Sequence, residues 1–252
     1  MGGALARGWR ARGLGPVTIV EPDPAAAARL ADTGATVAAI VPADLKPEVT
    51  VFAVKPQGMA DVAPAYRKYA GGSVFLSIAA GRTLKFFAGT LGSSAAVVRS
   101  MPNTPAAVGR GFTVACANAA VSVSQRALCA ALLEAVGEVA WVDDEALLDP
   151  VTAVSGSGPA YVFLLIEALA DAGKAAGLSA DLAARLARAT VIGSGELARL
   201  APESPAELRR AVTSPGGTTE AALKVLMAPG GLGDLMTRAV LAAADRSREL
   251  AG

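Results

Sequence analysis

The chain has 252 residues, a formal net charge of +1, and a composition that is 53% hydrophobic but only 4% aromatic. This composition is typical of a globular protein with one or two domains. The near-zero charge argues against a nucleic-acid partner or an anionic membrane surface, since both demand a basic patch. The sequence contains no His and only two Cys. A Ser–His–Asp triad, a Cys–His dyad and a zinc site are therefore excluded or disfavoured, and we expect no metal.

The N-terminal segment contains Arg7, Arg10 and Arg12 but no apolar stretch after them. No uncharged apolar run long enough to cross a bilayer follows. We therefore expect neither a signal peptide nor a membrane helix, and a cytoplasmic location. Cys116 and Cys129 lie in apolar segments, where a buried thiol is a better interpretation than a reactive one.

The first half of the sequence alternates short apolar runs with helical patterns. Strands are expected at residues 17–20, 35–38, 48–54, 73–78, 95–100, 112–117 and 138–142, and helices at 2–13, 25–32, 59–69, 84–91 and 124–136. This alternation predicts an α/β fold with a Rossmann-like, doubly wound, mostly parallel sheet. Ligands bind beyond the carboxyl ends of such strands. Three groups follow predicted strands in this way: Lys55, residues 79–81 and residues 101–104.

Glu21 follows the strand predicted at residues 17–20. In dinucleotide-binding folds, an acidic residue at the end of the second strand accepts a hydrogen bond from the ribose 2′-hydroxyl. Gly2 would then be the last glycine of the phosphate-binding turn, and the first strand and earlier glycines are missing from the sequence as given. The alternative interpretation of Glu21 is a surface carboxylate before a proline turn.

The pattern changes after Asp143, where strands stop and helices take over. Helices are expected at residues 160–177, 180–200, 205–212, 220–227 and 232–250. Several of them are apolar on more than one side and so bury more than one face. We therefore predict a dinucleotide-binding domain at residues 1–145 and an all-α dimerisation and substrate domain at 146–252. The expected partner is a second subunit, in a homodimer.

Residues 213–219 read Thr-Ser-Pro-Gly-Gly-Thr-Thr and stand directly before a predicted helix. Backbone N–H groups and hydroxyls that converge at a helix N-terminus can bind a small anion. The alternative is an ordinary capped loop, because Ser, Thr and Gly are favoured there in any protein. Similar small-residue clusters occur at residues 155–160, expected to form a turn that opens a long helix, and at residues 101–105.

Taken together, these segments resemble pyrroline-5-carboxylate reductases, which reduce a cyclic imine to proline. The resemblance depends on five stretches in matching order: residues 51–57, 77–81, 99–105, 155–163 and 208–226. It spans nearly the whole chain. The departure is at the front, where family members have a strand and a complete glycine-rich turn. A missing central strand would leave its neighbours with unpaired edges.

The resemblance implies hydride transfer from a reduced nicotinamide to the C=N carbon of 1-pyrroline-5-carboxylate. It assigns the substrate carboxylate to the Ser214 hydroxyl and to the N–H groups of Gly216, Gly217 and Thr218. It places the Thr219 hydroxyl near the ring nitrogen, so Ser214 and Thr219 are the expected catalytic residues. The residues that the resemblance and the Glu21 interpretation assign to the cofactor are Gly2, Glu21, Ala53, Lys55, Pro56, Ala79, Gly81, Met101, Asn103 and Thr104.

The expected cofactor is NADPH, the family default, with NADH as the alternative because Glu21 would repel a 2′-phosphate. Lys55 has the alternative role of a solvated strand-end lysine, and the cluster at residues 155–159 that of a purely structural segment. Two other functions stay open: a reductase of another cyclic imine or of a β-hydroxyacid, and a non-catalytic dimeric relative. Assembly of dimers into a ring is not determined by the sequence.

Overall fold

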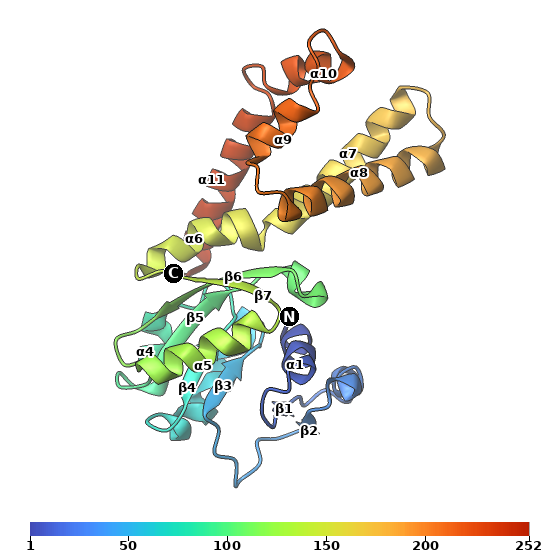
Figure 1. Cartoon of the computed structure of the whole chain (residues 1–252). Helices are drawn as coiled ribbons and strands as arrows, with labels where there is room; N and C mark the ends of the chain where they lie inside the picture. Colours follow the sequence, from blue (N-terminus) through green and yellow to red (C-terminus); the bar gives the residue numbers. More distant parts are fainter. Residues whose placement is uncertain (252) are drawn as a thin grey trace. The chain divides into compact units, whose positions relative to one another are not determined.

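The computed structural model describes residues 1–251, with the side chain of residue 251 left out. The chain forms two compact units (Figure 1). The first unit comprises Met1–Ser157 together with the end of the chain from Ala243, and the second is Gly158–Ala242. Compactness therefore divides the chain after Ser157 and not after residue 145, and the final helix returns to the first unit. The predicted functional boundary at residue 145 stays a prediction.

The first unit contains a five-stranded sheet and a separate two-stranded one. The large sheet has the order β3-β4-β5-β6-β7, and the small one pairs β1 with β2. All neighbours are parallel except β5 and β6, which are antiparallel. The strands are β1 (Thr18–Val20), β2 (Thr36–Ala38), β3 (Val49–Phe52), β4 (Val74–Ser77), β5 (Val97–Met101), β6 (Gly111–Ala117) and β7 (Gly137–Trp141). The predicted α/β fold with a mostly parallel sheet is confirmed.

Four strands of the described residues, β1, β2, β3 and β7, each pair with a single neighbour and so have one unpaired edge. Strand β1 pairs with β2 alone, and β3 pairs with β4 alone. An unpaired strand edge presents a row of N–H and C=O groups without partners in the sheet. The strands of the first unit are thus divided between two sheets and do not form one continuous sheet.

The helices of the first unit lie between these strands. They are α1 (Gly2–Ala11), α2 (Pro24–Ala28), α3 (Met59–Val62), α4 (Leu84–Leu91), α5 (Val123–Glu134) and α6 (Leu148–Val151). The helix predicted at residues 59–69 is α-helical only to Val62 and continues as a 3₁₀ helix over Ala63–Tyr69. Pro64 has no N–H group and cannot donate the α-helical hydrogen bond, which explains the change. The helix predicted at residues 25–32 likewise ends at Ala28.

The core of the first unit lies on both faces of the large sheet, because alternate strand residues point to opposite sides. On one face, Leu5 and Trp9 of α1 pack with Leu133 of α5, and Trp9 Nε1 donates a hydrogen bond to the Leu132 carbonyl at 2.8 Å. On the other face, the Phe52 ring stacks on Phe75 and Phe87 with centroids 5.8 and 5.6 Å apart. Helices thus cover both faces, as a doubly wound fold requires.

The helices of the second unit are α7 (Gly158–Ala175), α8 (Ala180–Leu200), α9 (Pro205–Ala211), α10 (Thr218–Leu226) and α11 (Leu232–Ala251), the last of which ends in the first unit. Helices α7 and α8 pack closely: a Cβ atom added to Gly173 would lie 3.2 Å from the Ala183 Cβ. The predicted all-α second half is confirmed.

The turn predicted at residues 155–159 is wrong. Residues Thr152–Gly156 form a π-helical segment, and the Ser157 N–H donates to the Thr152 carbonyl at 2.8 Å. Helical backbone therefore runs from Glu145 to Ala175. The glycines and serines suggest a turn, but the backbone only bends at Ser157, and α7 begins at Gly158 with Pro159 as its second residue. Such π-helical insertions within helices are often found at functional sites.

Much apolar surface is exposed in the second unit. Exposed large side chains include Phe163 at 59%, Leu164 at 63% and Ile192 at 62%. The helical stretch Glu145–Ala175 is long and apolar enough, by length and composition alone, to cross a membrane. The sequence interpretation did not anticipate this property. One such helix is weak evidence for a membrane, since helices with covered apolar faces in water-soluble proteins pass the same test.

Candidate functional site

The carboxyl ends of three neighbouring parallel strands meet at one edge of the large sheet. Strands β3, β4 and β5 lie side by side, with Phe52 opposite Ser77 and Ser77 opposite Arg99. Eight of the ten predicted cofactor residues lie at the ends of these strands or in the segments that follow them, and the structure brings them to the same edge. These residues are Ala53, Lys55, Pro56, Ala79, Gly81, Met101, Asn103 and Thr104.

Gly2 lies at the same edge, beside Ala53. A Cβ atom added to Gly2 would be 2.8 Å from the Ala53 Cβ, closer than real Cβ atoms approach. Gly2 is also the first residue of α1, whose N-cap Met1 forms no side-chain cap hydrogen bond. A helix N-terminus with a bare glycine allows a phosphate group to approach the backbone N–H groups. The structure therefore joins the predicted last glycine of the turn to the sheet edge.

Asn103 holds together the loop after β5 and the π-helical segment. Its Nδ2 donates to Ser155 Oγ at 3.1 Å, and its Oδ1 accepts from the Phe112 N–H at 2.9 Å. A Cβ added to Gly156 would lie 3.4 Å from the Met101 Sδ. The Ser155–Gly156 pair thus packs on the loop after β5 and fixes the Asn103 amide. Thr104 is exposed and begins the 3₁₀ helix Thr104–Val108.

The loop after β4 needs glycine at Gly81, where φ is +69°. A Cβ there would lie 3.1 Å from the Leu250 carbonyl oxygen, so the end of α11 packs against this loop. The neighbouring Arg82 Nε donates to the Pro56 carbonyl at 2.8 Å and connects the loops after β3 and β4. The sequence interpretation missed Arg82. Its position directly after Gly81 was the available signal.

Glu21 is at the end of β1, as predicted, and its N–H donates to the Ala38 carbonyl at 2.9 Å. Its side chain accepts a hydrogen bond from the Asp23 N–H at 3.0 Å. Asp23 in turn caps α2 by accepting from the N–H groups of Ala25 and Ala26. The carboxylate therefore helps to form the proline turn, and its alternative role as a turn residue has direct geometric support.

The turn before α10 is in the second unit. The Gly217 N–H donates to the Ser214 carbonyl at 3.0 Å, and Gly216 has φ of +70°. Pro215 and Gly216 occupy the two central positions, the pattern of a type II turn. Gly217 is the N-cap of α10 without a side-chain cap. The two hydroxyl residues Thr218 and Thr219 then begin the helix.

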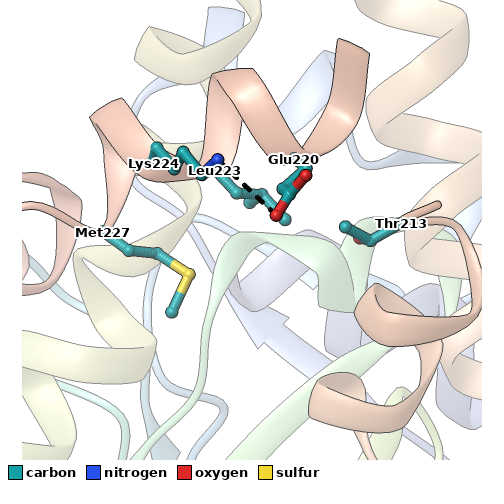
Figure 2. Close-up of a pocket in the computed structure, with 5 residues that line it drawn as sticks. All are labelled: Thr213, Glu220, Leu223, Lys224 and Met227. Carbon is teal, nitrogen blue, oxygen red and sulfur yellow. Dashed lines mark ion pairs between the residues drawn. The ribbon is translucent and has the colours of Figure 1, made fainter. Parts of the chain in front are cut away.

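A side chain already occupies part of this turn. The Gly216 N–H donates to Glu220 Oε2 at 2.6 Å, while Glu220 Oε1 lies 3.6 Å from Lys224 Nζ. A cavity of about 340 Å³ lies beside this ion pair and is lined also by Thr213, Leu223 and Met227. Figure 2 shows the ion pair and the lining side chains. Of the three backbone N–H groups predicted to bind a carboxylate, those of Gly216 and Gly217 thus have acceptors within the protein. The sequence interpretation missed Glu220.

A buried ion pair lies behind the loops of the first unit. Arg99 Nη1 is 2.8 Å from Glu145 Oε1, and the Arg99 side chain is 4% exposed. The same carboxylate oxygen accepts from the Leu84 N–H at the start of α4 at 2.7 Å. Glu145 therefore connects β5, α4 and the start of the long helical stretch. A buried charge needs such partners, because an unpaired ion loses its hydration without compensation.

Both cysteines are buried, as predicted. Burial raises the pKa of the Cys129 thiol to about 12, and burial is also the main cause that raises the pKa of Cys116. Neither thiol is therefore an activated nucleophile. Within residues 1–251, no group of three or more His, Cys, Asp or Glu side chains could hold a metal ion.

The fold and the family models define the class of protein. Residues 1–81 match a family model described as NADP oxidoreductase, coenzyme F420-dependent. Residues 145–250 match a model described as pyrroline-5-carboxylate reductase dimerisation. The chain is thus built as a nicotinamide-dependent oxidoreductase with a helical dimerisation region.

Full-length relatives identify the family. The chain is 44% identical to the pyrroline-5-carboxylate reductase of Pseudomonas aeruginosa, covering 100% of this chain and 93% of the relative. It is 46% identical to that of Synechocystis over 81% of this chain and 75% of the relative. The chain belongs to the pyrroline-5-carboxylate reductase family, and the predicted resemblance is confirmed.

Solved structures agree with this assignment. The Coxiella burnetii pyrroline-5-carboxylate reductase superposes with a TM-score of 0.90 at 34% identity, covering 99% of this chain and 94% of that one. The Plasmodium falciparum enzyme, solved with NADP bound, gives a TM-score of 0.82 at 30% identity and covers 100% and 96% of the two chains.

Proposed function

We propose that this protein reduces 1-pyrroline-5-carboxylate to L-proline with NADPH, the last step of proline biosynthesis. The observation that supports it most is the relative from Pseudomonas aeruginosa, which matches this chain over its full length at 44% identity. The matched region includes the turn at residues 214–219, the part of the second unit with the chemistry to hold a small carboxylate.

The reaction needs positioning more than acid–base power. NADPH, when bound, supplies a hydride to the C=N carbon, and the electron pair of the C=N bond moves to the ring nitrogen. Because the imine is protonated beforehand, that nitrogen becomes a neutral amine and no strong general acid is required. The chain must mainly hold two rings face to face, which turns a bimolecular step into a positioned one. The absence of His is therefore no obstacle.

The residues of the second unit have roles in binding and orientation. The Ser214 hydroxyl and the N–H groups of Gly216, Gly217 and Thr218 would hold the substrate carboxylate. The Thr219 hydroxyl, in the first turn of α10, would accept a hydrogen bond from the protonated ring nitrogen. In this structure the Gly216 N–H donates to Glu220 and the Gly217 N–H to the Ser214 carbonyl, so substrate binding at these two groups would require them to exchange or share their acceptors.

The residues of the first unit fit a nicotinamide dinucleotide. The close approach of Gly2 to Ala53 leaves no room for a side chain where the backbone must approach a phosphate. The Asn103 amide, fixed by Ser155 and Phe112, is held rigidly enough to orient a nicotinamide or its ribose. Lys55, Pro56, Ala79, Gly81, Met101 and Thr104 would line the rest of the same site.

Glu21 affects the choice between NADPH and NADH. Its carboxylate would accept from a ribose 2′-hydroxyl but repel a 2′-phosphate. In the observed arrangement it accepts from the Asp23 N–H and stabilises the turn. We propose NADPH as the main cofactor, with NADH as an alternative that Glu21 tolerates.

The second unit supports a homodimer. Its helices expose many large apolar side chains, Phe163 and Leu164 among them. A stable protein in water usually covers an apolar surface of this kind. A second copy is the simplest partner, because a twofold interface matches each patch with itself. We therefore propose a homodimer that can assemble further into a ring. We also propose a cytoplasmic location, with no nucleic-acid or membrane partner.

A β-hydroxyacid reductase is the weaker alternative. A catalytic lysine would be expected near the start of the first long helix, whereas Lys174 lies near the end of α7 and forms an ion pair with Asp171 at 2.6 Å. A free ammonium placed for catalysis is therefore missing at this position.

The assay is direct. Purified protein is mixed with 1-pyrroline-5-carboxylate and either NADPH or NADH, and the loss of reduced nicotinamide and the formation of proline are followed. We expect one proline for each cofactor oxidised, with a higher kcat/KM for NADPH. If neither cofactor is consumed, the proposed function is wrong and the non-catalytic alternative stands.

A further inference from the structure

The Glu220 side chain accepts a hydrogen bond from the Gly216 N–H, a group that the proposed function assigns to the substrate carboxylate. Its Oε2 accepts from the Gly216 N–H at 2.6 Å, and the side chain is 37% exposed. The N-terminal end of a helix stabilises negative charge, whether it comes from a ligand or from the protein. The protein's own carboxylate therefore lies where an external carboxylate would be stabilised.

Glu220 also has a second partner that can hold it elsewhere. Lys224 is one helical turn further along α10, with its Nζ 3.6 Å from Glu220 Oε1 and its side chain 73% exposed. A glutamate has three rotatable bonds, so its carboxylate can leave Gly216 and stay paired with Lys224. The cavity beside it, lined by Thr213, Leu223 and Met227 as well, gives room for this movement (Figure 2).

Helix α11 begins with an equivalent contact, at a turn to which the proposed function assigns no substrate. Asp234, the third residue of α11, accepts from the Gly230 N–H at 2.5 Å. Glu220 is likewise the third residue of α10. Both carboxylates thus close a helix N-terminus after a Pro-Gly-Gly turn, but the hydroxyl residues Ser214, Thr218 and Thr219 are present only at the first. Asp234 supplies a matched control for the capping effect alone.

We infer that Glu220 is an internal competitor for the substrate carboxylate and so sets the affinity of the turn for its ligand. This inference depends on the proposed function, because it takes the turn at residues 214–219 as the carboxylate site. Before the substrate acid can use the Gly216 N–H, the Glu220 carboxylate must leave it. The substrate thus exchanges with a side chain of the protein, and the Gly216 N–H keeps a carboxylate acceptor in the empty site.

The competition between Glu220 and the substrate for the Gly216 N–H can be weakened without removing the Glu220 side chain. Glu220→Gln keeps the shape and one acceptor oxygen but removes the charge. Hydrogen bonds to a charged acceptor are about twice as strong as neutral ones, so the amide holds the Gly216 N–H less firmly. It also no longer repels an incoming anion. We expect carboxylate affinity to rise about 3- to 10-fold, the size of the difference between a charge-assisted and a neutral hydrogen bond.

The test measures binding and turnover separately on full-length protein. The probe for binding is cyclopentanecarboxylate, which has the ring and the acid but no imine, and its Kd is measured by calorimetry for the wild type, Glu220→Gln and Asp234→Asn. The KM and kcat for 1-pyrroline-5-carboxylate are measured in parallel. We expect a lower Kd and a lower KM for Glu220→Gln, with the change in KM and not in kcat, and wild-type values for Asp234→Asn.

Equal or weaker binding by Glu220→Gln, the same gain in Asp234→Asn, or no binding by any of the three proteins would overturn the inference. Glu220→Ala is the second variant if the Gln variant folds poorly, and the same gain is expected for it. A wild-type protein that binds cyclopentanecarboxylate but reduces no imine contradicts the proposed reaction instead. The calorimetric comparison still decides the role of Glu220 in that case.

Discussion

The aromatic side chains of the two units have opposite surroundings. In the first unit Phe52, Phe75 and Phe87 are at most 2% exposed and stack between the sheet and α4. In the second, Phe163 is 59% exposed within a single chain. The first unit thus buries a large aromatic core by itself, whereas the second leaves most of its large apolar side chains exposed within one chain. The core of the first unit stabilises a single chain. In the proposed dimer, the stability of the second unit would depend on a second copy and so on protein concentration.

Function divides along the same line. The first unit holds the residues predicted to bind the cofactor on buried strands and on loops that bond to other segments, such as Asn103 to Ser155. The second presents its hydroxyls on an exposed turn between two short helices, α9 and α10. A site on a rigid sheet edge needs little reorganisation, while an exposed turn can exchange one acceptor for another.

The largest effect on this comparison is expected at Phe75. Replacing this fully buried ring by alanine, Phe75→Ala, leaves a cavity beside Phe52 and Phe87 and should cost about 3–5 kcal/mol of unfolding free energy. Urea unfolding measures it. Val123 is 88% exposed in the same unit, so Val123→Ala is the control and should change stability by less than about 0.5 kcal/mol. Equal effects at both positions would contradict a self-contained core.

A charge on the exposed apolar face of the second unit should weaken the proposed dimer. Phe163→Glu introduces a charge into the surface that we expect to be covered by a second copy. The dimer Kd should rise about 100-fold, or about 2.7 kcal/mol. Light scattering at several concentrations measures the mass. Val123→Glu, a charge on an isolated exposed apolar residue, should leave the dimer intact. A Phe163→Glu protein with the wild-type mass would show that this face does not form the interface.

The exposed turn should respond in catalysis and not in folding. Thr219→Val removes the hydroxyl placed near the ring nitrogen and keeps the shape of the side chain. We expect kcat/KM to fall about 10- to 1000-fold, or about 1.4 to 4 kcal/mol of transition-state stabilisation. Steady-state kinetics and a melting curve together measure it. Wild-type turnover by this variant would exclude the proposed role of Thr219.

The smallest effect concerns the pH dependence of the first unit. Burial raises the pKa of Cys129 to about 12, while an unfolded thiol ionises near pH 9. Between these values the unfolded chain loses a proton that the folded chain keeps, so stability is complete below pH 9 and falls as the pH rises. At pH 10 the loss is about 1.4 kcal/mol.

Cys129→Ala isolates this effect. The variant loses stability at every pH because a buried side chain is shortened, but its decline between pH 9 and 10 should be shallower than in the wild type. Urea unfolding at both pH values measures the two slopes. Identical slopes would mean that the Cys129 thiol ionises in the folded protein as readily as in the unfolded chain.

Helix ends with side-chain caps were predictable from the sequence. Helices α4 and α8 have the predicted bounds, because Thr83 accepts from the Phe86 N–H and Ser179 from the Leu182 N–H at their starts. Local signals of this kind depend only on neighbouring residues. An ambiguous local signal led to a wrong prediction in one segment. The Ser-Gly-Ser-Gly cluster that begins at Ser155 predicted a turn, but it forms π-helical and α-helical backbone.

The sequence by itself determined the alternation of strands and helices, the change to helices after Asp143, and the three strand ends that meet at one edge of the sheet. These features follow from periodicity and from the geometry of parallel sheets, which one chain segment can specify. Only the tertiary structure decided that Arg99 pairs with Glu145, 46 residues away, that Asn103 bonds to Ser155, 52 residues away, and that Gly2 touches Ala53. Such contacts depend on how distant segments pack, and a long side chain such as that of Glu220 selects its partner only after the turn beside it has formed.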